Sequence, residues 1–188
     1  MKTEKVLSIL LIISLLFVSI NWPGAKLFVI MSLLILALVY FPFAFYFFSD
    51  KTLKRQNLAV SIIFGWLLSI IPIGIMFKLM FWPGYHVMIL TSCLTAPILL
   101  IIAFILFKKS KEDLKTYYKN LLSRTTVLTI AAFIMLAMPL ETLIKFQSDG
   151  DTELDRLKVL YYTNPENSTY KKQHDDYLTK RDSIYESE

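Results

Sequence analysis

The side chains that could carry chemistry are few, and one carboxylate beside an apolar stretch stands out. Glu141 lies in the sequence AMPLETLIKF, one helical turn before Lys145. Glu before Lys at this spacing is the favourable order for an ion pair on one helix face, and Pro139 just before it predicts a kink. Glu141 is therefore either the partner of Lys145 at the membrane surface or an intramembrane contact to another helix, where a carboxylate could carry protons.

The remaining titratable residues match no catalytic or metal-binding pattern. The chain has two histidines, His86 and His174, and one cysteine, Cys93. Neither histidine has companions at a firm metal-ligand spacing, although His174 is followed by Asp175 and Asp176. The sequence also lacks the H-E-x-x-H, G-x-S-x-G and phosphate-binding loop motifs. We therefore predict a protein that is not an enzyme and has no metal or cofactor.

The composition indicates an integral membrane protein. Of the 188 residues, 55% are hydrophobic and 14% aromatic, and the mean hydropathy is +0.54. A bilayer core about 30 Å thick is crossed by roughly 20 apolar residues in a helix. The first apolar run follows Lys2 and Lys5 as in a secretory signal, but no small-residue cleavage site comes after it, so we expect a retained helix. Five spans are predicted: 6–21, 27–48, 58–80, 86–107 and 125–145.

The motif Trp-Pro-Gly interrupts the apolar sequence twice, at residues 22–24 and 82–84. Pro removes a helix donor, Gly tolerates unusual backbone angles and Trp prefers the depth of the membrane interface. Each motif therefore predicts a hairpin tip, and the two hairpins form a parallel duplication. The tips act as structural anchors or bind a partner. The predicted motif residues are Phe17, Trp22, Pro23, Gly24, Phe77, Lys78, Trp82, Pro83 and Gly84, with Lys78 reaching toward lipid headgroups.

The basic residues predict the orientation. Lys and Arg number two before the first span, three in SDKTLKRQN and six in KKSKEDLKTYYKNLLSR, and such residues favour the cytoplasmic side. Residues 146–188 instead carry six Lys or Arg against ten Asp or Glu. Five alternating spans place the N-terminus in the cytoplasm and the C-terminus outside. The predicted segments are hairpins at 1–48 and 58–107, a basic amphipathic segment at 108–124, a fifth helix at 125–145 and an extracytoplasmic tail at 146–188.

The segment 108–124 has the pattern of a short amphipathic helix. Leu114, Tyr118 and Leu121 recur at helical spacing, and Leu122 extends that face. The basic residues Lys111, Lys115 and Lys119 follow one another every fourth residue on another face. We expect this helix to lie on the anionic inner leaflet, or alternatively to dock a cytoplasmic protein.

The tail predicts two short helices separated by the turn TNPENS. Leu154, Leu157 and Tyr161 lie on one side of the first, while Tyr170, Tyr177 and Ile184 repeat every seven residues in the second. Because these apolar stripes are thin, the helices need each other, the membrane domain or a partner to be stable.

The stretch FKLMFWPGYHVMIL, residues 77–90, resembles the F-K-x-x-H-W-P-G-A pattern of the transmembrane hairpin family of the gliding motility protein GldL. The first copy, FVSINWPGAK, has Val18 where that pattern has Lys. The resemblance implies an inner-membrane component near the motor of the gliding and type IX secretion machinery. That motor is thought to take up protons on an intramembrane glutamate, and neither 27–48 nor 86–107 contains a carboxylate. The resemblance therefore implies a family member that does not itself conduct protons.

These patterns lead to two functional hypotheses. The first is a non-enzymatic scaffold or assembly subunit of the bacterial inner membrane, whose partners are lipids and other membrane subunits, including further copies of itself, and not nucleic acid. The alternative is a small transporter or channel subunit, because duplicated hairpins often line a transport path.

Overall fold

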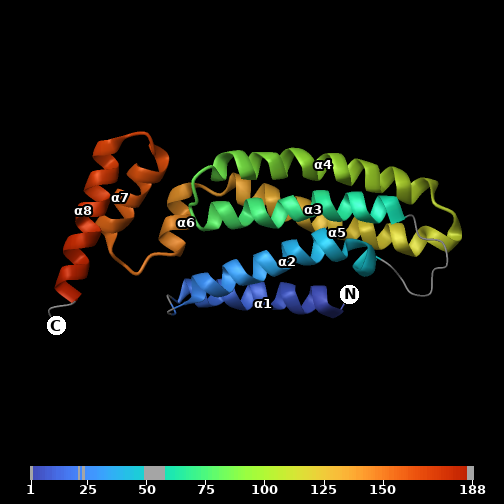
Figure 1. The fold of residues 1–188 in the computed structure, drawn as a ribbon, viewed down its shortest axis with the longest axis horizontal. Coiled ribbons are helices and arrows are strands. Elements are labelled where there is room, and N and C mark those ends of the chain that lie inside the picture. The colour runs from blue at the N-terminus through green and yellow to red at the C-terminus, as the bar shows by residue number, and fades with distance from the viewer. Residues whose placement is uncertain (1, 21, 23, 49–57, 186–188) are drawn as a thin grey trace. The chain divides into compact units, whose positions relative to one another are not determined.

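The computed structural model describes residues 2–20, 22, 24–48 and 58–185 (Figure 1). In this part of the chain every regular element is an α-helix, so the predicted all-α class is confirmed there. The helices of the described residues are α1 (Lys2–Ser19), α2 (Ala25–Phe48), α3 (Leu58–Leu79), α4 (Tyr85–Lys109), α5 (Glu112–Ala137), α6 (Leu140–Phe146), α7 (Thr152–Thr163) and α8 (Ser168–Tyr185).

The chain divides into two compact units. The first, here called the N-terminal unit, consists of residues 1–17 and 23–137. The second, called the C-terminal unit, consists of residues 18–22 and 138–188. The main division between the two units falls at the end of α5.

Three helices of the N-terminal unit are long and apolar enough to cross a membrane. They comprise Ala59–Leu79, Tyr85–Lys109 and Glu112–Ala137, which are 21, 25 and 26 residues long. The apolar stretches found in α1 and α2 are shorter, namely Ile9–Ser19 and Ala25–Val39. The helices therefore agree with the predicted class of membrane protein, whereas the count of five spans stays a prediction.

The helices of the N-terminal unit pack on one another along small or aliphatic residues. Close packing joins α2 to α3, α3 to α4, and α5 to both α3 and α4. Gly74 of α3 permits a close approach to α4, because an added Cβ would lie 2.8 Å from the Met88 carbonyl oxygen and would collide with the Ser92 side chain. The outward faces remain apolar, as expected of a surface in contact with lipid. The buried core includes Leu68, Ile71, Ala96, Leu99, Ala103, Leu121 and Ala132.

Helix α5 differs from the two segments predicted for this region. A single helix runs from Glu112 to Ala137 and so joins most of the predicted amphipathic segment 108–124 to the following apolar stretch. No Gly or Pro interrupts this sequence, and the buried Tyr118 and Leu121 continue the inward face of the apolar part. The predicted span 125–145 is in turn cut short before Pro139, which ends α5 instead of kinking a continuous helix.

The C-terminal unit is a small helical domain with its own core. Helix α6 packs on α7, and α7 packs on α8, as Figure 1 shows. The buried residues at these contacts include Leu143, Ile144, Leu154 and Leu157. Asp151 begins α7 by accepting a hydrogen bond from the Leu154 amide at 3.0 Å. The two predicted tail helices are thus present as α7 and α8.

Candidate functional site

The two Trp-Pro-Gly turns use their glycines in the same backbone conformation. Gly24 has φ +82° and Gly84 has φ +81°, both in the left-handed region that favours glycine. Gly84 immediately precedes α4, and its carbonyl accepts a hydrogen bond from the Met88 amide at 3.1 Å. The expected role of the glycines is therefore confirmed, while Pro23 lies outside the described residues.

The end of α3 is produced by a Schellman motif rather than by the proline. The Trp82 amide donates to the Phe77 carbonyl at 3.0 Å, and the Phe81 amide donates to the Lys78 carbonyl at 3.3 Å. Phe81 adopts φ +52° at the position that these two bonds enclose. Our expectation that Pro83 ends the helix is therefore wrong, because the turn is complete before the proline is reached.

Aromatic packing accompanies this motif. The rings of Phe77 and Trp82 meet edge to face with centroids 5.1 Å apart. A contact between these two positions commonly accompanies a Schellman turn. It gives a physical reason for the spacing of Phe and Trp in the motif, since the pair helps to hold Phe81 in a conformation that costs a non-glycine residue about 1–2 kcal/mol. The corresponding residues of the first copy are a half-buried Phe17 and an exposed Trp22.

Lys78 of the same motif caps the far end of α5. Its side chain is buried, and its Nζ donates to the Met135 carbonyl at 2.6 Å and to the Leu136 carbonyl at 3.0 Å. The peptide nitrogen four residues after Met135 belongs to Pro139 and carries no hydrogen, so a helix could not satisfy that carbonyl. A cation is also favourable at the negative end of a helix dipole. We expected Lys78 to extend to the lipid headgroups, but its side chain instead caps α5 inside the bundle.

Further polar contacts cross between α3, α4 and α5. Ser92 Oγ lies 3.1 Å from the Ile70 carbonyl oxygen and 2.9 Å from that of Met88. The Cys93 thiol donates to the Ala132 carbonyl at 3.4 Å, one turn before the end of α5 that Lys78 caps. These side chains join backbones of different helices, which fits a role in holding the bundle together.

Near the beginning of α3, a second polar contact ties it to α5. The hydroxyls of Ser61 and Tyr117 are hydrogen-bonded, and the Tyr117 ring meets that of Tyr118 edge to face at 5.0 Å. Arg124, two turns further along α5, is also buried. The sequence interpretation missed this contact. The sequence feature that could have revealed it is a pair of tyrosines and an arginine on the apolar side of the amphipathic segment.

The three predicted lipid-facing lysines are exposed. Lys111 directly precedes α5, Lys115 pairs with Glu112 at 2.7 Å, and Lys119 lies one turn later. The opposite face of this part of α5, with Tyr117 and Tyr118, is buried in the bundle. The amphipathic pattern is thus confirmed, but its apolar side packs against helices. The role of the lysines at the lipid surface stays a prediction.

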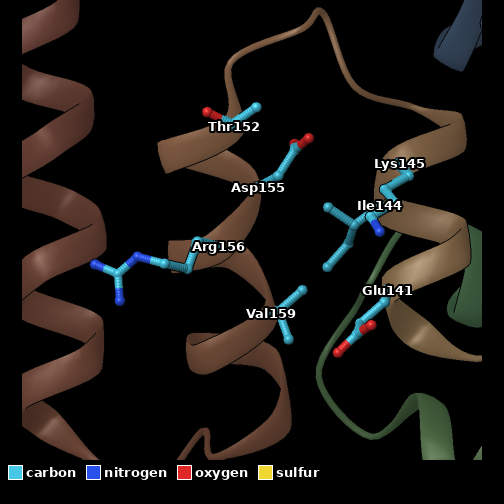
Figure 2. A pocket seen from close by; sticks show the side chains of 7 residues that line it. All are labelled: Glu141, Ile144, Lys145, Thr152, Asp155, Arg156 and Val159. Atoms are coloured by element: carbon cyan, nitrogen blue, oxygen red, sulfur yellow. The ribbon is translucent and has the colours of Figure 1, made fainter.

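Glu141 and Lys145 lie on α6, in the C-terminal unit, and border a cavity between α6 and α7 (Figure 2). The two residues are one helical turn apart on α6, but the predicted ion pair between them is not formed. Ile144 and Val159 point toward each other across the cavity, whereas the Arg156 guanidinium points away and pairs with Glu153 at 2.7 Å. The remaining residues around the cavity are Thr152 and Asp155.

The histidines take part in aromatic contacts. His174 is buried, stacks on Tyr161 with centroids 5.2 Å apart and has Nδ1 3.1 Å from Asp175 Oδ1. The His86 ring lies against that of Tyr85 at 3.9 Å. Within residues 2–20, 22, 24–48 and 58–185, no three His, Cys, Asp or Glu residues are grouped closely enough to hold a metal ion.

No protein-family model, curated protein or solved structure matches this chain. The family resemblance thus rests on the motif residues themselves. In the described structure, those residues form a turn and a helix cap. The candidate site is accordingly the polar cluster in which Lys78 of α3 donates hydrogen bonds to the Met135 and Leu136 carbonyls of α5. Its contacts hold these two helices together.

Proposed function

We propose that the protein is a non-enzymatic scaffold or assembly subunit of the bacterial inner membrane. The observation that supports this most directly is the Lys78 cap: a buried cation in an apolar helix bundle is held by two backbone carbonyls of another helix. Intramembrane charges often mark transport or proton pathways, yet here the charge completes a helix terminus. Its hydrogen bonds hold α3 against the end of α5.

The distribution of acidic residues also favours a scaffold, because the three candidate spans carry them only in the first turn of α5, at Glu112 and Asp113. Residues 58–111 and 114–140 contain no Asp or Glu. A relay that takes up protons at neutral pH needs a carboxylate, a histidine or a similar group along its path. The acidic residues instead gather in the C-terminal unit, whose charged helices α7 and α8 form a surface suited to a protein partner.

The proposed topology has five spans, with the N-terminus in the cytoplasm and the C-terminal unit outside. Helix α2 supports this count, because its 24 residues extend about 36 Å and include only one charged residue, Lys26. Helix α1 has 18 residues, with its charged residues confined to the first turn.

Association with the gliding and type IX secretion machinery is part of the same proposal, and the Trp-Pro-Gly motif supports it.

Affinity purification of the tagged full-length chain in mild detergent tests the scaffold proposal. We expect defined membrane proteins to copurify at a fixed stoichiometry and to be lost when the exposed side chains of α7 and α8 are changed to the opposite charge. Identification of secretion-machinery subunits among them would support that assignment. Recovery of the chain alone, from membranes where it is abundant, would contradict a scaffold role.

The second candidate is a transporter or channel subunit, favoured by the duplicated hairpin turns with matching glycine conformations. Replacement of Glu141 by Gln separates the two, because an ion-coupled device would lose function at normal abundance whereas a scaffold would not. Complementation of a deletion strain, scored beside immunoblots of membrane fractions, provides the measurement. The exposed position of Glu141 on α6 leads us to expect near-normal function.

A further inference from the structure

An apolar groove lies between α4 and α5. Leu100, Ile101 and Phe104 line it from α4, and Leu122 and Thr126 line it from α5. The Thr126 hydroxyl already donates to the Leu122 carbonyl at 2.9 Å, so this lining side chain has its donor satisfied within the helix. The groove has a volume of about 410 Å³, within the range of about 300–1,000 Å³ that is common for ligand pockets.

Two lysines stand at one end of this groove. Lys108 follows Phe104 by one turn, and its Nζ lies 4.8 Å from the centroid of the Phe104 ring. Lys119 precedes Leu122 by one turn on α5 and is exposed. Since α4 and α5 pack together and are joined through residues 110–111, both lysines belong to the same end of the helix pair (Figure 1).

The charges of these lysines are available to a ligand. Lys115, one turn before Lys119, is paired with Glu112 at 2.7 Å. Lys119 and Lys108 form no ion pair with the residues that the structure describes. The site therefore combines an apolar groove between the two candidate membrane spans with two lysines at the end where α4 and α5 are connected.

We propose that this groove binds an anionic phospholipid, with one acyl chain along Leu100, Ile101, Phe104, Leu122 and Thr126 and its phosphate between Lys108 and Lys119. An anionic lipid matches both parts of the site, since its chain is apolar and its headgroup opposes the lysines in charge. A second copy of the chain, paired through the same groove, would bring the lysines of both copies together. The proposal does not depend on the scaffold function.

Native mass spectrometry of the full-length protein in detergent provides the test, with phosphatidylglycerol and phosphatidylcholine of identical acyl chains as probes. We expect wild-type protein to retain phosphatidylglycerol in preference. Changing Lys108 and Lys119 to Gln should lower that preference about five-fold for each lysine, corresponding to about 1 kcal/mol per charge. The control Lys171→Gln with Lys172→Gln removes the same charge from exposed positions of α8 and should leave the preference unchanged.

A second pair of variants tests the groove itself. Thr126→Phe fills the groove and should reduce bound phosphatidylglycerol, whereas Val127→Phe, at the neighbouring exposed position, should not. Equal retention of the two lipids by wild-type protein would overturn the proposal, as would unchanged binding in both the lysine and Thr126 variants. A wild-type dimer that Thr126→Phe separates would assign the groove to a second copy and would also overturn it.

Discussion

The ammonium of Lys78 donates a hydrogen bond to the carbonyl of Met135, 57 positions later in the chain, at 2.6 Å. The same ammonium also reaches the Leu136 carbonyl at 3.0 Å. One residue of the second Trp-Pro-Gly motif thus contributes to two structures: its backbone carbonyl belongs to the turn after α3, and its side chain caps α5. This relationship links the second hairpin tip to the C-terminal end of α5.

Replacing Lys78 by Met should destabilise the bundle by about 1.5–3 kcal/mol, because buried carbonyls lose a charged donor. Thermal unfolding in detergent, followed by loss of the monodisperse peak in size-exclusion chromatography, measures the effect. Lys109→Met, at an exposed position of α4 outside the proposed lipid site, serves as the control. A Pro139→Ala change should lessen the penalty by restoring a peptide N–H for Met135, and a Lys78→Met protein as stable as wild type would disprove the capping role.

Replacing Gly74 by Ala should destabilise the α3–α4 contact by about 1–3 kcal/mol through overpacking. The added Cβ would lie 2.8 Å from the Met88 carbonyl oxygen, which is backbone and cannot turn aside. Gly84→Ala is a useful comparison, because nothing lies within 4 Å of its added Cβ and only the φ of +81° opposes the change. Ser92→Ala should rescue Gly74→Ala only in part, and complete rescue in thermal unfolding would show that the backbone contact is unimportant.

The C-terminal unit should lose stability in acid through Asp151. Hydrogen bonds from the Leu154 amide and from the Tyr177 hydroxyl lower the pKa of the Asp151 carboxyl below its ordinary value. A carboxyl with a depressed pKa in the folded state stabilises the fold above its unfolded pKa, and this contribution disappears as the pH falls below about 4.

Hydrogen exchange of residues 152–185 in the full-length protein, corrected for the intrinsic effect of pH on exchange, measures this change. Asp151→Asn should flatten the dependence on pH and weaken protection at neutral pH. Glu166→Gln, in the exposed turn between α7 and α8, is the matched control. An Asp151→Asn protein whose protection still falls as in wild type would assign the acid sensitivity to other groups.

The proposed orientation predicts which residues can be labelled from outside the cell. In a Cys93→Ala background, a cysteine at Ser183 on α8 should react with an impermeant maleimide in intact spheroplasts, and a cysteine at Ser110 between α4 and α5 should not. Lysed cells, in which both sites should react, provide the control. Reversed labelling would invert the topology, and labelling of both sites in intact spheroplasts would change the number of spans.

The sequence alone determined the helical class, the main apolar helices, the places of the two turns and the two tail helices. These features depend on local properties: apolar length, helical periodicity, and the backbone preferences of Pro and Gly. Gly24 and Gly84, for example, adopt positive φ angles that the motif itself predicts.

The tertiary structure decided which groups meet. The sequence interpretation did not include the partner of Lys78 on α5 or the Ser61–Tyr117 hydrogen bond. It also predicted a Glu141–Lys145 ion pair that is not formed. A burial pattern specifies which face of a helix turns inward, but it does not specify the neighbour that this face will contact. That choice depends on the packing of residues far apart in the chain, where a close approach at Gly74 and an unsatisfied carbonyl at Met135 determine which polar side chain completes the structure.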